Sequence, residues 1–102
     1  MRTLTAISLA AAVLGGPALA SSDDAWSAFR KEVADSCLAL GAGLMDTPKA
    51  VVDPFGSEHY GLALVEGTAK GSATPVRAVC VYDKATKKAE IGGELPDDTA
   101  AQ

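Results

Sequence analysis

Two cysteines, Cys37 and Cys80, constrain the fold of this chain more than any other feature. They do not form the Cys-x-x-Cys pattern of redox and zinc sites, and no haem-attachment motif is present. The single histidine, His59, cannot complete a cysteine-rich metal site. An even number of cysteines in an exported chain favours a disulfide. Closing so long a loop stabilises a domain by at most about 4 kcal/mol in the chain-entropy view.

Residues 1–20 have the layout of a secretory signal peptide. One positive charge at Arg2 precedes an apolar run over 4–14, followed by a Gly-Gly-Pro breaker and a small-x-small cleavage site that ends at Ala20. The apolar run of about 11 residues is much shorter than the roughly 20 that a membrane-spanning helix needs. The next residue is Ser21 and not the cysteine of a lipoprotein. We therefore expect cleavage after Ala20 and a periplasmic or secreted product that is not inserted in the membrane.

The chain after this cleavage site has about 82 residues, enough for one small domain that buries about two thirds of its unfolded surface. We place the domain at 21–96 and expect the polar segment 97–102 to be a disordered tail. The whole chain has a formal charge of −4, and the signal peptide contributes only a positive charge, so the domain itself is more acidic. This charge disfavours nucleic acid and anionic membrane surfaces as partners.

Residues 24–40 have the apolar periodicity of an amphipathic helix. Acidic residues stand at its start, and Gly41-Ala42-Gly43 provides the stop. The apolar stripe consists of Trp26, Phe29, Val33, Cys37 and Leu40. Cys37 therefore points toward the place where a sheet would pack.

The rest of the chain alternates between short apolar runs and turns, which predicts strands near 49–52, 58–66, 76–82 and 88–95. The clearest turn lies at 52–56, where Asp53, Pro54 and Gly56 occupy positions that type I turns favour. An alternative for 49–52 is a single helical turn that starts at Thr47-Pro48. Because every connection is short, neighbouring strands should be antiparallel.

A disulfide with Cys37 requires Cys80 to face the helix, so alternation places Val76, Ala78 and Tyr82 on the same inner face. In the last strand the same alternation places four residues on one face: Ala89, Ile91, Gly93 and Leu95. We thus predict an α+β domain: one N-terminal helix packed on a four-stranded antiparallel meander, with one helix-to-strand disulfide.

Val79 and Val81 then face outward, which is unusual for two valines. Together with the small row Gly61, Ala63 and Val65 they could form a flat apolar patch on the outer sheet face. Such a patch would serve contact with a protein partner or self-association. The alternative is that the segment 21–24 or the tail covers it.

Asp53, Glu58 and His59 could in principle form a metal-binding or hydrolytic site. Catalytic triads normally converge from distant parts of a chain, whereas these residues, with Ser57, belong to one turn and its flank. Two carboxylates and one imidazole would bind a divalent ion only weakly. We therefore predict no catalytic or metal-ligating residue and no cofactor.

Two further residues are candidates for a binding surface. Lys70 lies in the segment 67–74, which has the composition of a phosphate-binding loop but not the order of its glycine and lysine residues. We expect this segment to be the longest mobile loop. Phe55 occupies the third position of a tight turn, where turn chemistry does not require an aromatic residue. We expect Phe55 to fold back onto the core, with a contact surface as the alternative.

No catalytic, nucleotide or metal motif emerges from the sequence. We therefore predict a non-enzymatic binding or interaction module of the cell envelope. Its candidate binding surface consists of Phe55, Val79, Val81 and Lys70. The alternatives from other classes are the metal or hydrolytic site above and an inhibitor of an envelope or host enzyme.

Overall fold

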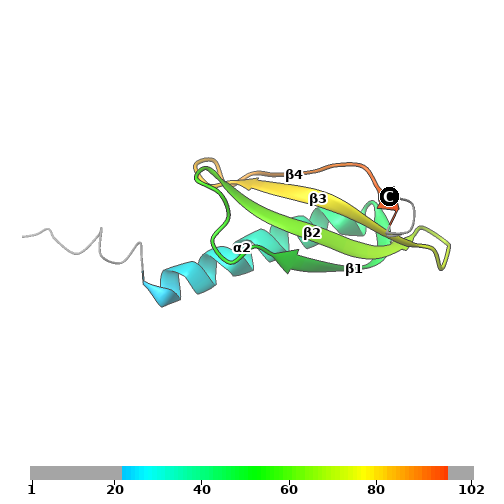
Figure 1. The fold of residues 1–102 in the computed structure, drawn as a ribbon, viewed down its shortest axis with the longest axis horizontal. Helices are drawn as coiled ribbons and strands as arrows, with labels where there is room; N and C mark the ends of the chain where they lie inside the picture. The colour runs from blue at the N-terminus through cyan, green and yellow to red at the C-terminus, as the bar shows by residue number, and fades with distance from the viewer. Residues whose placement is uncertain (1–21, 97–102) are drawn as a thin grey trace, which may run out of the picture.

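The computed structural model describes residues 22–96, and the expected signal peptide over 1–20 and the tail over 97–102 lie outside this part of the chain. It contains one helix, α2 (Asp23–Ala42), followed by β1 (Met45–Val52), β2 (Tyr60–Ala69), β3 (Pro75–Asp83), β4 (Ala89–Ile91) and β5 (Leu95–Pro96) (Figure 1). The sheet is an antiparallel meander in the order β1-β2-β3-β4, and β5 also pairs with β3. The predicted α+β fold class is therefore confirmed. Within 22–96, no helix is long and apolar enough to cross a membrane.

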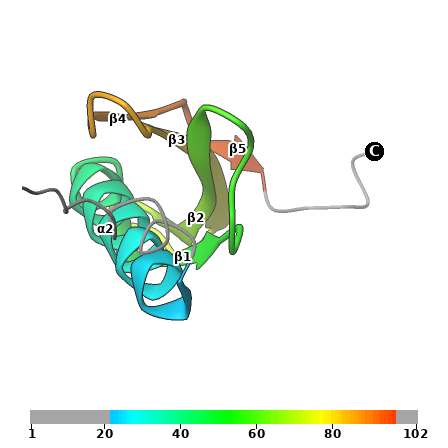
Figure 2. The same cartoon turned by 90° about the vertical axis from the view of Figure 1, so that its left-hand side faces the viewer.

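The helix lies along one face of the sheet and leaves the other face without a helix (Figure 2). A helix of 20 residues is about 30 Å long, and β2 with its 10 residues spans about 33 Å, so the two layers match in length. The hydroxyl of Ser22 accepts a hydrogen bond from the Ala25 amide at 3.1 Å and caps the first turn.

The buried stripe of α2 consists of Val33, Cys37 and Gly41, while Trp26 and Phe29 are half-buried. Leu40, which the periodicity placed on this stripe, is 37% exposed. The last turn approaches the sheet too closely for a leucine, because a Cβ on Gly41 would lie 2.7 Å from Val65 Cγ1. The residue facing the sheet there is consequently glycine.

The segment 49–52 belongs to a strand, so the helical-turn alternative is wrong. β1 begins at Met45, earlier than predicted, and its pairing with β2 shifts register between Asp46 and Lys49. Thr47, inside this irregularity, has a φ of 48°. Thr47-Pro48 therefore forms a β-bulge in a longer strand and not a helical turn. Proline is tolerated in a bulge because its nitrogen does not need to donate a hydrogen bond to the neighbouring strand.

The last predicted strand is split into β4 and β5. Ala89 and Ile91 lie opposite Tyr82 and Cys80 and pack against the core. Leu95 lies opposite Arg77, on the outer face, so the predicted grouping of Leu95 with Ala89 and Ile91 is wrong. The pairing slips by one residue across Gly92-Gly93, and a slip of one residue moves the next side chains to the opposite face.

The disulfide between Cys37 and Cys80 is present, with the two Cα atoms 6.0 Å apart. Both cysteines are fully buried between α2 and the inner face of β3, as predicted. The inner face carries a buried core of Val33, Cys37, Met45, Ala63, Val65, Val76, Ala78, Cys80 and Tyr82.

The small row of β2 lies on this inner face, which corrects its predicted outward position. Ala63 lies directly opposite Cys80, and Gly61 lies opposite Tyr82. Residues opposite each other in adjacent strands share a face. Because the helix lies close to β2 here, only small side chains fit, and the larger Leu62 and Leu64 point outward.

Candidate docking surface on the outer face of the sheet

The outer face of the sheet, opposite α2, carries a continuous set of apolar side chains. Register pairing places Val51 beside Leu64, Leu64 beside Val79, and Leu62 beside Val81. We call the set Val51, Leu62, Leu64, Val79, Val81 and Leu95 the outer patch. Sequence reasoning identified Val79 and Val81 but assigned the wrong row of β2 to accompany them.

The outer patch is open to solvent in the described structure. Val51, Val79 and Leu95 are 56%, 47% and 50% exposed, respectively. Residues 22–24 do not cover the patch, because they start α2 on the opposite side of the sheet (Figure 2). The tail, the other expected cover, lies outside the described residues. A shallow groove of about 490 Å³ runs along the patch, lined by Val51, Val52, Asp53, Pro54, Leu62, Ala63, Leu64 and Val79.

Charged residues border the outer patch at both ends of its strands. On the side of the β2–β3 connection, Lys49, Glu66 and Arg77 lie opposite one another in adjacent strands. On the other side are Asp53, whose amide pairs with Leu62, and Glu90, which lies opposite Val81. In the row of residues next to the patch, the first border therefore has a net positive charge and the second border has a negative charge. One pair further out, Asp46 lies opposite Thr68 on the first side and Asp83 lies opposite Tyr60 on the second side.

Asp53 is held in place by the turn that follows β1. Its Oδ1 accepts hydrogen bonds from the Gly56 amide at 2.9 Å and the Phe55 amide at 3.1 Å. These bonds stabilise the carboxylate and hold the pKa of Asp53 below its usual value. Gly56 has a φ of 71°, and a Cβ there would clash with the Tyr60 carbonyl oxygen. The negative charge of Asp53 is thus permanent at neutral pH and fixed in position.

The proposed grouping of Asp53, Glu58 and His59 does not form a single site. Asp53 lines the groove of the outer patch, whereas Glu58 and His59 line a different pocket. The Glu58 carboxylate and the His59 imidazole are 3.8 Å apart, and their side chains are 87% and 75% exposed. Among residues 22–96, no group of three or more histidine, cysteine, aspartate or glutamate side chains could hold a metal ion.

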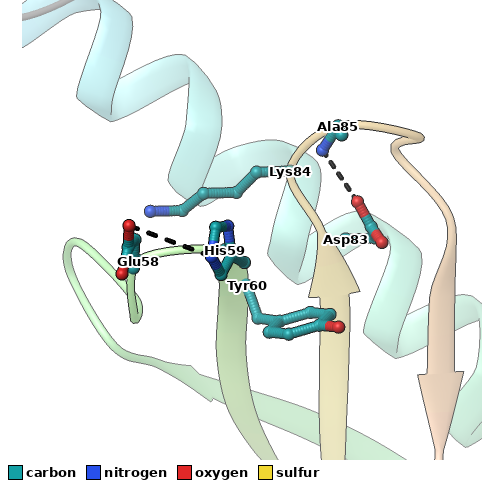
Figure 3. A pocket seen from close by; sticks show the side chains of 6 residues that line it. All are labelled: Glu58, His59, Tyr60, Asp83, Lys84 and Ala85. Atoms are coloured by element: carbon teal, nitrogen blue, oxygen red, sulfur yellow. Dashed lines mark hydrogen bonds and ion pairs between the residues drawn. The ribbon is translucent and has the colours of Figure 1, made fainter.

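The second pocket, of about 460 Å³, is lined by Glu58, His59, Tyr60, Asp83, Lys84 and Ala85 (Figure 3). Two of its charged side chains, Lys84 and Asp83, form hydrogen bonds with the backbone of the surrounding loops. Lys84 donates through Nζ to the carbonyls of Ser57 at 2.7 Å and Phe55 at 3.0 Å. The Asp83 carboxylate accepts hydrogen bonds from the amides of Thr86 and Ala85, and these bonds lower its pKa. The arrangement joins two neighbouring loops and offers no buried acid, base or nucleophile to a substrate.

The other two sequence candidates, Phe55 and Lys70, lie away from the outer patch. Phe55 is 55% exposed, so it does not enter the core as expected; its ring meets Trp26 edge-on at 5.0 Å between centroids. Lys70 donates to the Ala42 carbonyl at 3.0 Å at the C-terminal end of α2.

The loop that contains Lys70 is shorter than predicted. β2 continues to Ala69, and the connection to β3 covers 70–74. The Gly71 amide donates to Asp46 Oδ2 at 2.8 Å, which ties the loop to β1. Gly67 lies in β2 against the bulge, since a Cβ there would be 2.5 Å from the Asp46 carbonyl oxygen. The four candidate residues therefore occupy three separate places.

Comparisons of this chain with protein-family models, with curated proteins and with solved structures find no match.

Proposed function

We propose that this domain is a non-enzymatic binding module of the cell envelope that recognises a protein partner through the outer patch. The observation that carries the proposal is the exposure of Val51, Val79 and Leu95 on one face that the described chain leaves uncovered. Contiguous exposed apolar surface is costly in a small soluble domain and commonly marks a contact surface. An inhibitor of an envelope or host enzyme would be one kind of module of this type.

The envelope assignment rests on two independent features. Residues 1–20 have the pattern of a cleavable export signal, and the Cys37–Cys80 disulfide is of the kind that persists in oxidising compartments. N-terminal sequencing of protein from the envelope should begin at Ser21. Thiol reagents should label neither cysteine before reduction.

The binding proposal is tested by photo-crosslinking in cells that express the full chain. A photoreactive amino acid replaces Val79 in one variant and Ala39, exposed on α2, in the control. The variant at Val79 should form a covalent adduct with a specific protein on irradiation, and the variant at Ala39 should not. Absence of any adduct at Val79, or equal adducts at both positions, would contradict the proposal.

A further inference from the structure

We infer that the partner of the outer patch is a second copy of this chain, packed face to face about a two-fold axis. The inference rests on the proposed function, because it requires the outer patch to be a docking surface. It adds the identity of the partner and the orientation in which the two sheets meet.

The charges around the outer patch favour a partner with a similarly balanced surface. In the row of residues next to the patch there are two cations, Lys49 and Arg77, and three anions, Glu66, Asp53 and Glu90. The border of the patch therefore carries charges of both signs. A strongly cationic protein partner would match the whole chain but not this face. The face instead carries a net positive border and a negative border, which a second copy can match.

The orientation follows from these borders. A two-fold axis that crosses the strands at the level of Val79 turns the second sheet end over end, so each positive border meets a negative border. Arg77 then lies near Glu90 of the second copy, and Lys49 lies near Asp53 of the second copy. An axis along the strands would instead place Asp53 over Glu90 of the second copy, which brings like charges together.

The size of the face is compatible with a reversible dimer. With strands about 4.8 Å apart and residues about 3.4 Å apart along them, the face measures roughly 500 Å² as a flat surface, and side-chain relief adds to this area. Standard specific interfaces bury about 800 Å² per partner, so this contact is smaller than the standard size and belongs with weak, transient interfaces. We expect a dimer that dissociates at low protein concentration, and whose central contact is Val79 against Val79 of the second copy.

Sedimentation equilibrium of the oxidised, signal-cleaved protein over a range of concentrations measures the association. The unchanged protein should show a concentration-dependent dimer. Val79→Asp should weaken association at least about tenfold, because the two-fold axis buries two unpaired carboxylates together. Ser27→Asp, exposed on α2, is the matched control and should associate as the unchanged protein does.

A charge exchange tests the orientation. Arg77→Glu alone and Glu90→Lys alone should each weaken the dimer, and the double variant should recover it, because each altered residue then meets an opposite charge in the second copy. Arg77 also has an interaction within its own chain, so near-ultraviolet circular dichroism and thiol protection must show that each variant is folded. Failure of the double variant to recover association, with all variants folded, would overturn the proposed orientation.

The outcome separates this inference from the proposed function. If the protein stays monomeric at all concentrations while photo-crosslinking at Val79 traps a different protein, the second copy is the wrong partner and the docking surface stands. If the protein is monomeric and no adduct forms, both proposals are wrong. A dimer that Val79→Asp leaves intact uses another surface and also overturns the inference.

Discussion

Gly61→Ala is the sharpest test of how the helix and the sheet fit together. Gly61 lies on the inner face of β2, under α2, where a Cβ would be 2.5 Å from Val33 Cγ2 and 3.1 Å from Phe29 Cζ. Ordinary contacts between carbon atoms are about 3.5–4.0 Å, so the added methyl overlaps Val33 by roughly 1 Å. Val33 is fully buried and has a stiff β-branched side chain, so it cannot move aside without displacing the helix.

The expected loss of stability combines two opposing effects. Overpacking of a well-packed core typically costs about 1–3 kcal/mol. Replacing glycine with alanine recovers about 0.4–1 kcal/mol by restricting the unfolded chain. The net result should be a loss of about 1–2 kcal/mol in the free energy of unfolding, and each kcal/mol lowers the melting temperature of a domain this size by about 4–8 °C.

Urea unfolding of the oxidised protein, followed by circular dichroism, measures this change. Gly93→Ala is the matched control, because a Cβ at Gly93 meets no atom within 4 Å, and its effect should stay within about 0.5 kcal/mol. In the double variant Gly61→Ala, Val33→Ala, the new methyl group occupies space that the valine leaves, so the two losses should not add. If Gly61→Ala is as stable as the unchanged protein, the close approach of α2 to β2 is refuted.

Three further predictions concern the disulfide and two ionisable groups. Replacing both Cys37 and Cys80 by alanine should lower the free energy of unfolding by up to about 4 kcal/mol in urea titrations, because the bond closes a loop of 43 residues. Burial of Tyr82 and the hydrogen bond that its hydroxyl donates to Glu32 raise the pKa of Tyr82 to about 12. An unfolded tyrosine ionises at a pKa of about 10, so the free energy of unfolding should be unaffected below pH 10 and should decline as the pH rises to 12. This decline should be smaller in Tyr82→Phe. Backbone hydrogen bonds lower the pKa of Asp53 in the folded protein. They stabilise the fold fully at pH values above the pKa of Asp53 in the unfolded chain, and this stabilisation is lost as the pH falls through the lower pKa of the folded state. Asp53→Ala should therefore flatten the acid limb of the thermal-melting profile, and Asp53→Asn, which keeps an acceptor oxygen, should retain more of the turn's stability at neutral pH.

The helix, the antiparallel order and the disulfide could be predicted from the sequence because each depends on a local or pairwise pattern. The periodicity of Val33 and Cys37 identifies the buried side of the helix. Short connections require antiparallel neighbours. Once Cys80 must reach Cys37, the inner face of β3 follows from alternation alone.

The faces of β2 and of the last strand could not be predicted in the same way, because they depend on strand register. Alternation separates Leu62 and Leu64 from Ala63, but it does not say which row faces the helix. A general preference for large residues in the core favours the wrong row. The glycines at 41 and 61, one at the end of the helix and one in β2, are the signal that α2 and β2 approach closely. For Leu95, the relevant sequence feature is Gly92-Gly93. The pairing with β3 slips by one residue there, which moves Leu95 to the outer face.

The close approach of α2 to β2 connects the core to the candidate site. A helix that lies near the sheet excludes leucine from the inner row of β2, so the larger apolar residues of that strand occupy the outer row. Outward leucines in β2 could be explained by this constraint alone. It does not explain Val51 or Val79, which are more than two fifths exposed in the neighbouring strands, where polar β-branched residues such as threonine would serve the fold as well. The valines beside Leu64, rather than Leu64 itself, are therefore the residues that distinguish a docking surface from a by-product of packing.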